Sequence, residues 1–211
     1  MEMTNSKPRR GRPPKHARDN QDTKAILIRS GLEQLTETGF AASGIDIILK
    51  KVGVPKGSFY YYFSSKEAFG TAVIENYASF FMYQLDRCLS DESLPAIDRL
   101  SIFVASAKQG MAKFNYKRGC LIGNLEQEVD LLPESFRPLL TQIFVSWQNR
   151  LAQCLQQAQH DGQLSFNADC NKLAEIFWVG WEGAVSRAKL VESDQPLQDF
   201  YDFYQAGLPK N

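Results

Sequence analysis

The segment Ser43–Lys66, SGIDIILKKVGVPKGSFYYYFSSK, predicts two short helices joined by a tight turn. Ser43 is a favourable N-cap for the first helix because its hydroxyl can accept a hydrogen bond from a backbone N–H. Gly53 marks the turn, since glycine adopts a positive φ without strain. Pro55, with its fixed φ and missing N–H, suits the start of the next helix. Apolar side chains of the first helix recur at i, i+3, i+4 and i+7 and predict one buried stripe of Ile45, Ile48, Leu49 and Val52.

The second helix of this segment carries three consecutive tyrosines, Tyr60 to Tyr62. Phe59 and Phe63 are four residues apart, so we expect them to anchor the helix to the core. The outward face is then expected to hold Lys56, Ser58, Tyr60 and Tyr62. Packing alone does not explain the tyrosines, because each O–H needs a hydrogen-bond partner, and phosphate oxygens or base edges can supply one. The spacing therefore predicts a helix-turn-helix that enters a DNA groove.

The remaining sequence also has helical periodicity, and we expect an all-α protein. A helix over about 22–38 is expected to bury Ala25, Ile28, Leu32 and Leu35. After a cap at Ser65, helices are expected over about 66–89, 96–114, 125–130, 133–159, 169–190 and 197–204. This pattern predicts a basic arm over 1–20, a three-helix unit with the helix-turn-helix over 21–66, and a larger helical domain over 67–211, for which the family resemblance described next implies effector binding and dimerisation.

The string Gly53–Gly70, GVPKGSFYYYFSSKEAFG, resembles the signature of the TetR family of bacterial repressors. The resemblance implies a homodimer that pairs an N-terminal three-helix DNA-binding domain with a larger all-helical ligand domain. Two-fold symmetry presents two recognition helices to successive major-groove faces, so we expect the operator to be an inverted repeat. Repression is the expected mode, because it is the commoner one in this family, although the sequence alone leaves activation open.

The resemblance also implies which residues meet double-stranded operator DNA. On the second helix these are Lys56, Gly57, Ser58, Tyr60 and Tyr62, with both tyrosines expected on phosphates. Ser43 and Gly44 lie at a helix N-terminus, where exposed N–H groups can receive a phosphate. Lys66, at the start of the following helix, is expected on a phosphate as well, the alternative being a solvated lysine. The position of Tyr61 stays open, because it can instead pack inside the domain.

Composition supports a nucleic-acid partner once the two ends are separated. The chain of 211 residues has a formal net charge of zero. Residues 1–66, however, carry 12 Lys and Arg against six Asp and Glu, whereas residues 67–211 carry 12 against 18. One end thus suits a polyanion and the other repels it. With no membrane-length apolar run and no export signal, we expect a cytoplasmic protein that does not enter the membrane.

The N-terminal arm contains Arg9-Arg10-Gly11-Arg12-Pro13. An extended Arg-Gly-Arg strip is narrow enough for an A·T-rich minor groove, where the negative potential is strongest. We expect Arg10 and Arg12 to contact this groove beside the helix-turn-helix. The alternative is a basic tail that attracts phosphates without sequence preference.

Two segments of the larger domain, RGCLIGNL from Arg118 and WVGWEGA from Trp178, resemble a TetR subgroup that responds to small electrophilic or unsaturated compounds, including the acrylate-utilisation repressors. The resemblance implies a small-molecule effector, acrylate or a related unsaturated acid, and an effector site with Cys120, Trp178, Trp181, Glu182 and Arg187. Gly180 and Gly183 lie on the same helix as Trp178, and their missing side chains would allow either a ligand or a second subunit to approach closely. Arg187 and Lys189 could neutralise a carboxylate, the alternative being that these long cations are solvated, as cations on a helix usually are.

Cys120 has two interpretations. One is a small buried hydrophobe. The other is a reactive thiol: next to Lys117 and Arg118 at a helix start, its pKa would be lowered, and it could add to an activated alkene or be oxidised. An electrophile- or redox-sensing repressor therefore remains an alternative. An enzyme using Cys120 with His160 lacks an orienting third group. The widely spaced cysteines and isolated histidines predict no metal site, no cofactor and no disulfide.

An architectural DNA-binding protein without an effector is a further alternative, but it would not need a large acidic helical domain. We expect instead that effector binding tilts the helix over 66–89, which joins the two domains, and so separates the recognition helices from their operator spacing.

Overall fold

The computed structural model describes residues 20–210, and every regular element in that range is helical. The first four helices are α1 (Asn20–Thr38), α2 (Ile45–Val52), α3 (Lys56–Tyr62) and α4 (Lys66–Leu89). They are followed by α5 (Ala96–Lys113), α6 (Leu121–Gln127), the 3-10 turn η1 (Val129–Leu131), α7 (Phe136–His160), α8 (Cys170–Val191) and α9 (Gln195–Ala206). The predicted all-α class is confirmed.

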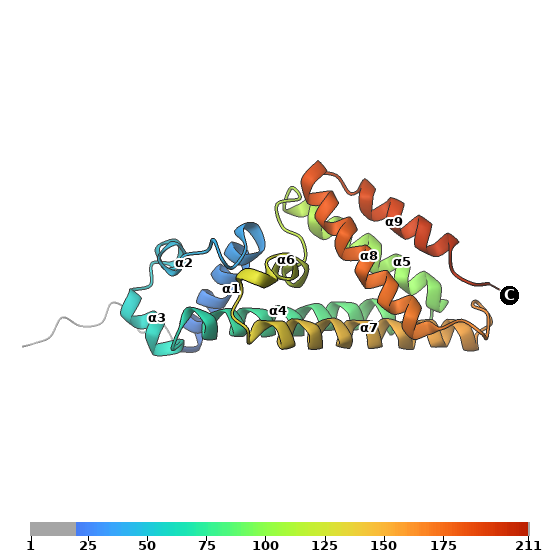
Figure 1. Ribbon diagram of the computed structural model, residues 1–211, viewed down its shortest axis with the longest axis horizontal. Coiled ribbons are helices and arrows are strands. Elements are labelled where there is room, and N and C mark those ends of the chain that lie inside the picture. Colours follow the sequence, from blue (N-terminus) through green and yellow to red (C-terminus); the bar gives the residue numbers. More distant parts are fainter. Residues whose placement is uncertain (1–19, 211) are drawn as a thin grey trace, which may run out of the picture.

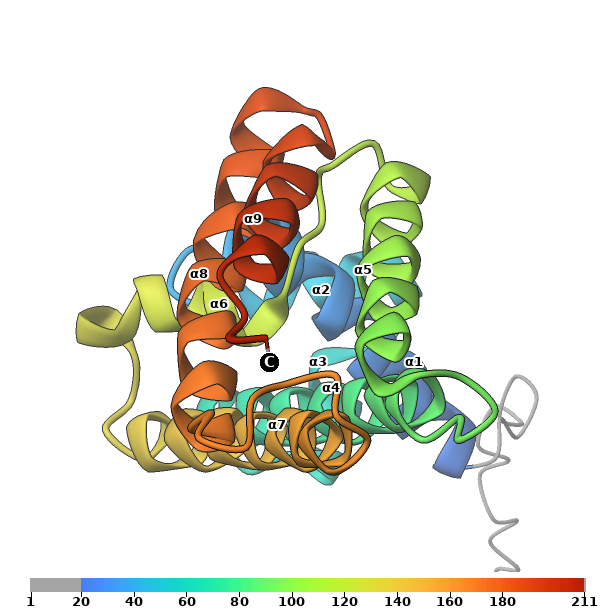
Figure 2. The same cartoon turned by 90° about the vertical axis from the view of Figure 1, so that its right-hand side faces the viewer.

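The helices form two groups that α4 connects. Helices α1, α2 and α3 lie at one end, and α4 runs from them along most of the length of the molecule (Figure 1). Helices α4 and α7 lie together at the base, while α5, α8 and α9 stand above them (Figure 2). The small helix α6 lies between the α1 end and α8, and it contacts α1, α4 and α8.

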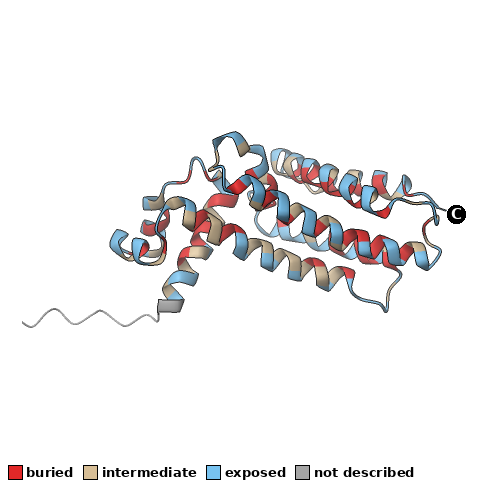
Figure 3. Ribbon diagram, turned by 60° about the horizontal axis from the view of Figure 1, so that its bottom comes forward, coloured by how far each residue is buried: buried red, intermediate tan, exposed pale blue. Residues whose placement is uncertain are grey.

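Buried side chains follow the inner faces of the long helices, whereas α2 and α3 are mostly exposed (Figure 3). The centre of the larger group is aromatic: Trp147 of α7 and Trp178 of α8 are almost fully buried, with ring centroids 5.2 Å apart. Phe81 of α4 packs on both indoles, at 4.2 and 5.9 Å. Burial of such rings dominates core stabilisation, so this cluster fixes how α4, α7 and α8 cross.

The turn chemistry of the helix-turn-helix is largely as predicted. Gly53 has φ +66° and donates its N–H to Leu49 O, which closes α2. Ser65 caps α4 by accepting a hydrogen bond from the N–H of Ala68. The predicted N-cap at Ser43 was wrong: Gly44 is the N-cap, and the Ser43 hydroxyl instead faces back to Gly39 O and to the Thr38 hydroxyl. A hydroxyl tied to the preceding turn cannot cap the following helix.

Two features differ from the predictions for a physical reason. In α1, Leu35 is buried as predicted, but Leu27 is buried and Ala25 is exposed, while Ile28 and Leu32 are only partly buried. The buried face is set by Gly31, which faces α4 so closely that an added Cβ would lie 2.3 Å from the Phe69 ring. In the segment around residue 120, the helix begins at Leu121 rather than near 125, with Cys120 as its N-cap. Its two glycines, which suggested a turn, make close contacts with α8.

Among the described helices, none combines the length and apolar character that a membrane crossing requires.

Candidate nucleic-acid interface and effector cavity

Helix α3 is held from behind by two aromatic anchors. Phe59 is fully buried and Phe63 nearly so, and each ring packs on Phe69 of α4, with centroids 5.3 and 5.0 Å apart. These are the anchors that the sequence predicted. They seat the start of α4 against α3, so the orientation of α3 depends on α4.

The three tyrosines of α3 differ in exposure, and the order corrects our prediction. Tyr61 is 73% exposed and Tyr60 49% exposed, whereas Tyr62 is half-buried and packs against the core. Neither Tyr60 nor Tyr61 hydrogen-bonds another described residue through its hydroxyl. The outward pair is thus Tyr60 and Tyr61, not Tyr60 and Tyr62. The sequence contained this information, because Phe59, Tyr62 and Phe63 fall at i, i+3 and i+4 and therefore share one face of the helix.

One helical turn before the outward tyrosines lie Lys56 and Gly57, and both are exposed. The Lys56 ammonium forms an exposed ion pair with Asp46 of α2, with Nζ 3.1 Å from Oδ1. A Cβ added to Gly57 would meet nothing within 4 Å, so the backbone there is open to a partner. Ser58 is partly covered. The reading face, defined as Lys56, Gly57, Tyr60 and Tyr61, is a basic and aromatic surface of the kind that phosphates and bases recognise.

Two further residues expected on DNA are engaged inside the protein. Ser43 is 1% exposed and its N–H donates to Phe40 O, so it does not offer the free N–H that we expected for a phosphate. Gly44, the actual N-cap of α2, is exposed. Lys66 donates its ammonium to Phe40 O at 2.8 Å and lies 4.5 Å from the centroid of the Phe40 ring. It therefore joins α4 to the α1–α2 turn instead of pointing to DNA. Arg10 and Arg12 lie outside the described residues.

A cavity of about 420 Å³ lies between α1, α4, α5, the α6 start and α8. Its walls are mainly apolar, with aromatic side chains from α4, α5 and α8. Of the residues predicted for an effector site, Cys120 and Trp181 line it. The sequence did not point to most of the other lining residues, which include Tyr77, Phe81, Phe103, Met111, Phe114 and Arg118. A mostly apolar cavity with a few polar groups is the usual form of a small-molecule site.

The Cys120 thiol is buried at the inner side of this cavity. Its Sγ lies 3.4 Å from the N–H of Gly123, the capping contact of α6, and it also hydrogen-bonds the Tyr77 hydroxyl. Burial, followed by the charge of Glu182, raises the pKa of the Cys120 thiol well above its usual range. The predicted lowering of its pKa was wrong, because the Arg118 guanidinium turns away to Glu37, with Nε 2.8 Å from Oε1.

Glu182 is 7% exposed and hydrogen-bonds Cys120. Burial raises its pKa from 4.5 to about 8, and the nearby Glu126 carboxylate adds to this shift. At neutral pH Glu182 is therefore largely a neutral carboxylic acid. Tyr77, Cys120 and Glu182 form the acid cluster, the name that we keep for this buried group of three proton-bearing side chains.

The other predicted effector residues, Trp178, Glu182 and Arg187, are not among the residues that line the cavity. Trp178 is buried in the aromatic centre rather than on the cavity wall, and Arg187 is on the exposed face of α8. Gly180 accommodates α9, because an added Cβ would lie 2.2 Å from the Phe200 ring; neither a ligand nor dimer packing is needed to explain it. Gly183 is exposed, with open space beside it.

Polar contacts link the segment after Cys120 to the DNA-binding end. The Glu128 carboxylate accepts hydrogen bonds from the N–H groups of Phe40 and Ala41, each at 3.0 Å. Asn124 donates its side-chain amide to Thr36 O at 2.9 Å. The α1–α2 turn is thus held by the residues that follow the cavity, and any displacement of α6 reaches the helix-turn-helix directly.

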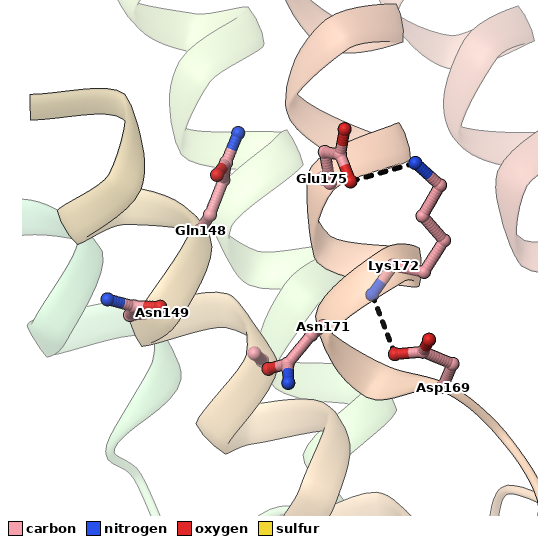
Figure 4. Close-up of a pocket in the computed structure, with 7 residues that line it drawn as sticks. Gln148, Asn149, Asp169, Asn171, Lys172 and Glu175 are labelled. Atoms are coloured by element: carbon pink, nitrogen blue, oxygen red, sulfur yellow. Dashed lines mark hydrogen bonds and ion pairs between the residues drawn. The ribbon is translucent and has the colours of Figure 1, made fainter. Parts of the chain in front are cut away.

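Another hollow, between α7 and α8, is polar and lies on the surface (Figure 4). Its charged groups are already satisfied: Lys172 Nζ is 2.9 Å from Glu175 Oε2, and Asp169 accepts the N–H of Lys172 as the α8 cap. His160 is exposed at the end of α7 and pairs with Asp161, so it does not form the thiol–imidazole pair considered for an enzyme. The described residues contain no cluster of three or more metal-ligating side chains.

Comparisons with known proteins agree with this geometry. Residues 27–73 match the model described as "Bacterial regulatory proteins, tetR family", and residues 96–204 match "Tetracyclin repressor-like, C-terminal domain". The chain is 49% identical over 194 residues to the transcriptional regulator AcuR of Cereibacter sphaeroides, covering 92% of this chain and 88% of that one.

Solved structures give the same result. The crystal structure of regulatory protein TetR from Rhodobacter sphaeroides aligns with a TM-score of 0.85 at 47% identity, covering 87% of this chain and 97% of that one. Escherichia coli NemR, described as an HTH-type transcriptional repressor, has a crystal structure of its reduced form that aligns at 0.78 with 30% identity, covering 90% and 98%. These relatives are regulators, not enzymes. The chain belongs to the TetR family of DNA-binding transcriptional repressors.

Proposed function

We propose that this repressor binds an inverted-repeat operator as a homodimer and is released by a small unsaturated acid, acrylate or a close relative, that enters the cavity. The observation that carries the proposal is the position of the cavity. It is lined by Cys120, the N-cap of α6, and α6 leads within eight residues to the Glu128 carboxylate that holds the α1–α2 turn. The cytoplasm, where the DNA lies, is the proposed location, and no catalytic role is assigned.

The reading face of α3 is the proposed DNA contact, with Gly44 receiving a phosphate at the α2 N-terminus. Exposed Tyr60 and Tyr61 support this, because two large aromatic side chains whose hydroxyls have no hydrogen-bond partner among the described residues lie at one surface. The proposed units are residues 21–66 for DNA binding and 67–211 for the effector and for dimerisation, with Arg10 and Arg12 of the 1–20 arm in the adjacent minor groove.

Exposed apolar side chains on α8 and α9 support the homodimer. Ile176 is 49% exposed, Val179 72%, Leu190 75% and Phe203 79%. A row of this kind on the last two helices is typical of a surface that a second copy covers. Two reading faces would then meet successive turns of one duplex.

Release follows from differential binding. An effector that prefers a conformation with α6 displaced shifts the population away from the operator-bound state, typically by about 1–3 kcal/mol of coupling. Displacement of α6 would carry the Glu128 and Asn124 contacts with it, and α4 would tilt because Lys66 joins it to the same turn.

The test is to titrate acrylate into a complex of the full chain with operator duplex and to follow fluorescence anisotropy. Acrylate is expected to release the DNA, whereas propionate, its saturated analogue, controls for the double bond. Retention of the duplex at every soluble acrylate concentration would contradict the effector assignment.

Electrophile sensing through Cys120 is the second candidate, favoured by a thiol on the cavity wall and by the resemblance to NemR, whose structure is described by its redox state. The raised pKa of this thiol makes it a poor nucleophile at rest. Cys120→Ser separates the two candidates. It abolishes a covalent response, which mass spectrometry would detect as an acrylate adduct on the wild type, and it leaves a reversible response largely intact.

A further inference from the structure

The acid cluster contains a buried carboxyl oxygen that the folded chain leaves unused. Oε1 of Glu182 is buried and has no hydrogen-bond partner within residues 20–210. Glu182 does not itself line the cavity but lies directly behind its wall: Trp181 and Val185, its neighbours on α8, line the cavity, and its hydrogen-bond partner Cys120 lines it too. A buried polar atom without a partner is costly. Its persistence beside a ligand-sized cavity indicates that a ligand completes its hydrogen bonding.

Helix α6 is shaped around this carboxyl group. A Cβ added to Gly123 would lie 2.0 Å from Oε2 of Glu182, a distance that real Cβ atoms do not show. The N–H of the same glycine is already engaged by Cys120 Sγ. Glycine at this position therefore reserves space for the carboxyl in the interior of a helix, where it is otherwise unfavourable.

Two cations line the cavity, Arg118 and Lys113. Arg118 binds Glu37 at 2.8 Å and Glu33 at 3.7 Å, and it stacks on Phe114. The Lys113 ammonium lies 5.7 Å from the centroid of the Phe114 ring and forms no ion pair among the described residues. At the Cys120 wall of the cavity, a ligand meets the acid cluster instead of these two cations.

Burial, together with a few titratable neighbours, sets the protonation of Glu182. Tyr77 comes from α4, and Cys120 and Glu126 come from the α6 segment. Lys189, later on α8, is directed to Asn124 Oδ1. Lys113 of α5 lies at the cavity wall, with Glu33 of α1 and Arg118. From α7 the neighbouring Trp147 does not titrate, and the α9 Tyr204 donates its hydroxyl to Leu173 O.

We propose that Glu182 recognises the effector as a neutral carboxylic acid and donates a hydrogen bond to a carboxylate or carbonyl oxygen of a small unsaturated acid or amide. This inference rests on the proposed function, since it assigns the binding chemistry of the same cavity. The carbon chain of the ligand faces the Phe81, Phe103 and Trp181 rings.

The inference predicts a pH dependence with a defined sign. Below a pH of about 8 Glu182 is protonated and donates to the anion, whereas above it the ionised carboxylate repels the anion. Acrylate affinity of the wild type, measured by calorimetry, is expected to be flat up to that pH and then to fall about tenfold per pH unit.

Glu182→Gln is the central variant, because its amide donates a hydrogen bond at every pH. Its acrylate affinity is expected to stay near the low-pH value of the wild type across the range. Acrylamide, a neutral probe of the same size, is expected to bind the wild type without pH dependence, because ionised Glu182 can accept from the amide N–H. Glu126→Gln is the matched control, because Glu126 is exposed and acts on Glu182 only through its charge. This variant should keep the pH dependence, with its midpoint at a somewhat lower pH.

Equal acrylate affinity of the wild type on both sides of pH 8, or wild-type affinity in Glu182→Ala, would overturn this inference while the proposed function stands. Acrylate binding at no pH would overturn both. A second measurement needs no ligand. Because the folded-state pKa lies above the ordinary value of 4.5, wild-type stability is expected to decline between pH 4.5 and about 8. Thermal melting should show a smaller decline for Glu182→Gln; identical profiles would contradict a neutral buried acid.

Discussion

The reading face and the effector cavity are built in opposite ways. The reading face stands on a seven-residue helix whose functional side chains point outward, while Phe59 and Phe63 hold it from behind. In the cavity, functional and structural side chains are not separate, because Cys120 and Trp181 belong to the buried core and also line the cavity. Substitutions on the first surface can change recognition at little cost in stability. Substitutions in the cavity change ligand binding and stability together.

The two regions meet in a small set of polar contacts around the α1–α2 turn. Glu128, Asn124 and Lys66 each bond a backbone group between residues 36 and 41. Contacts of this kind transmit a displacement because a hydrogen bond depends on distance and angle. The comparison therefore predicts three classes of variants: those that remove recognition, those that change the coupling, and those that do neither.

The largest effect is expected for Phe59→Ala. Removing a fully buried ring costs about 3–5 kcal/mol of stability and should abolish operator binding, because α3 loses its anchor. Denaturant unfolding and anisotropy on operator DNA provide the two readouts. Phe166→Ala, which truncates a ring that is 80% exposed, is the matched control and should change neither. Operator binding by a folded Phe59→Ala protein would show that α3 is not the reading element.

The next effect concerns the coupling. Glu128→Ala removes two charge-assisted acceptors from the Phe40 and Ala41 N–H groups and should cost about 1–3 kcal/mol. We expect lower operator affinity and faster amide exchange at these two residues, with acrylate affinity nearly unchanged. Glu128→Gln keeps one acceptor and should fall between the two. A Glu128→Ala protein with wild-type operator affinity would remove this contact from the proposed route.

Smaller effects separate the tyrosines. Tyr60→Phe and Tyr61→Phe each remove an exposed hydroxyl and should weaken operator binding by about 1 kcal/mol, with no loss of stability. Tyr62→Phe should act on stability instead, because Tyr62 packs against the core. A mobility-shift series on one duplex ranks the three. If Tyr62→Phe alone weakened binding, the assignment of the outward face would be incorrect.

The smallest effect is expected for Arg187→Ala. This side chain is exposed on α8 and is not among the residues that line the cavity, and surface substitutions of this kind usually stay within about 0.5 kcal/mol. Acrylate titration should therefore be unchanged. A clear loss of acrylate response would restore the original expectation that Arg187 neutralises the effector.

The sequence predicted the features that depend on local chemistry. The positive φ of Gly53, the Ser65 cap and the anchors Phe59 and Phe63 all follow from residue type and helical spacing, and each is confirmed. The inward position of Tyr62, in place of Tyr61, could also have been predicted from the sequence, because Tyr62 shares the helical spacing of the anchors Phe59 and Phe63. These features need no knowledge of distant residues.

The features that were missed depend on contacts between distant segments. The internal roles of Ser43 and Lys66 require the position of Phe40 relative to α4. The raised pKa of Cys120 requires α8 to bring Glu182 beside it, while Arg118 is drawn to α1. The neighbours of this thiol in the sequence, Lys117 and Arg118, suggested a basic environment. In the packed structure the thiol is instead buried beside an acidic side chain, Glu182.

The central claim is that the reading face selects a symmetric operator and that the cavity controls its release. In one experiment, random duplexes are selected on the immobilised full-length chain, eluted with acrylate, and sequenced against an elution with buffer alone. The account predicts an inverted repeat enriched in the acrylate eluate and absent from that of buffer. An acrylate eluate with no inverted repeat, or with the same sequences as the buffer eluate, would contradict it.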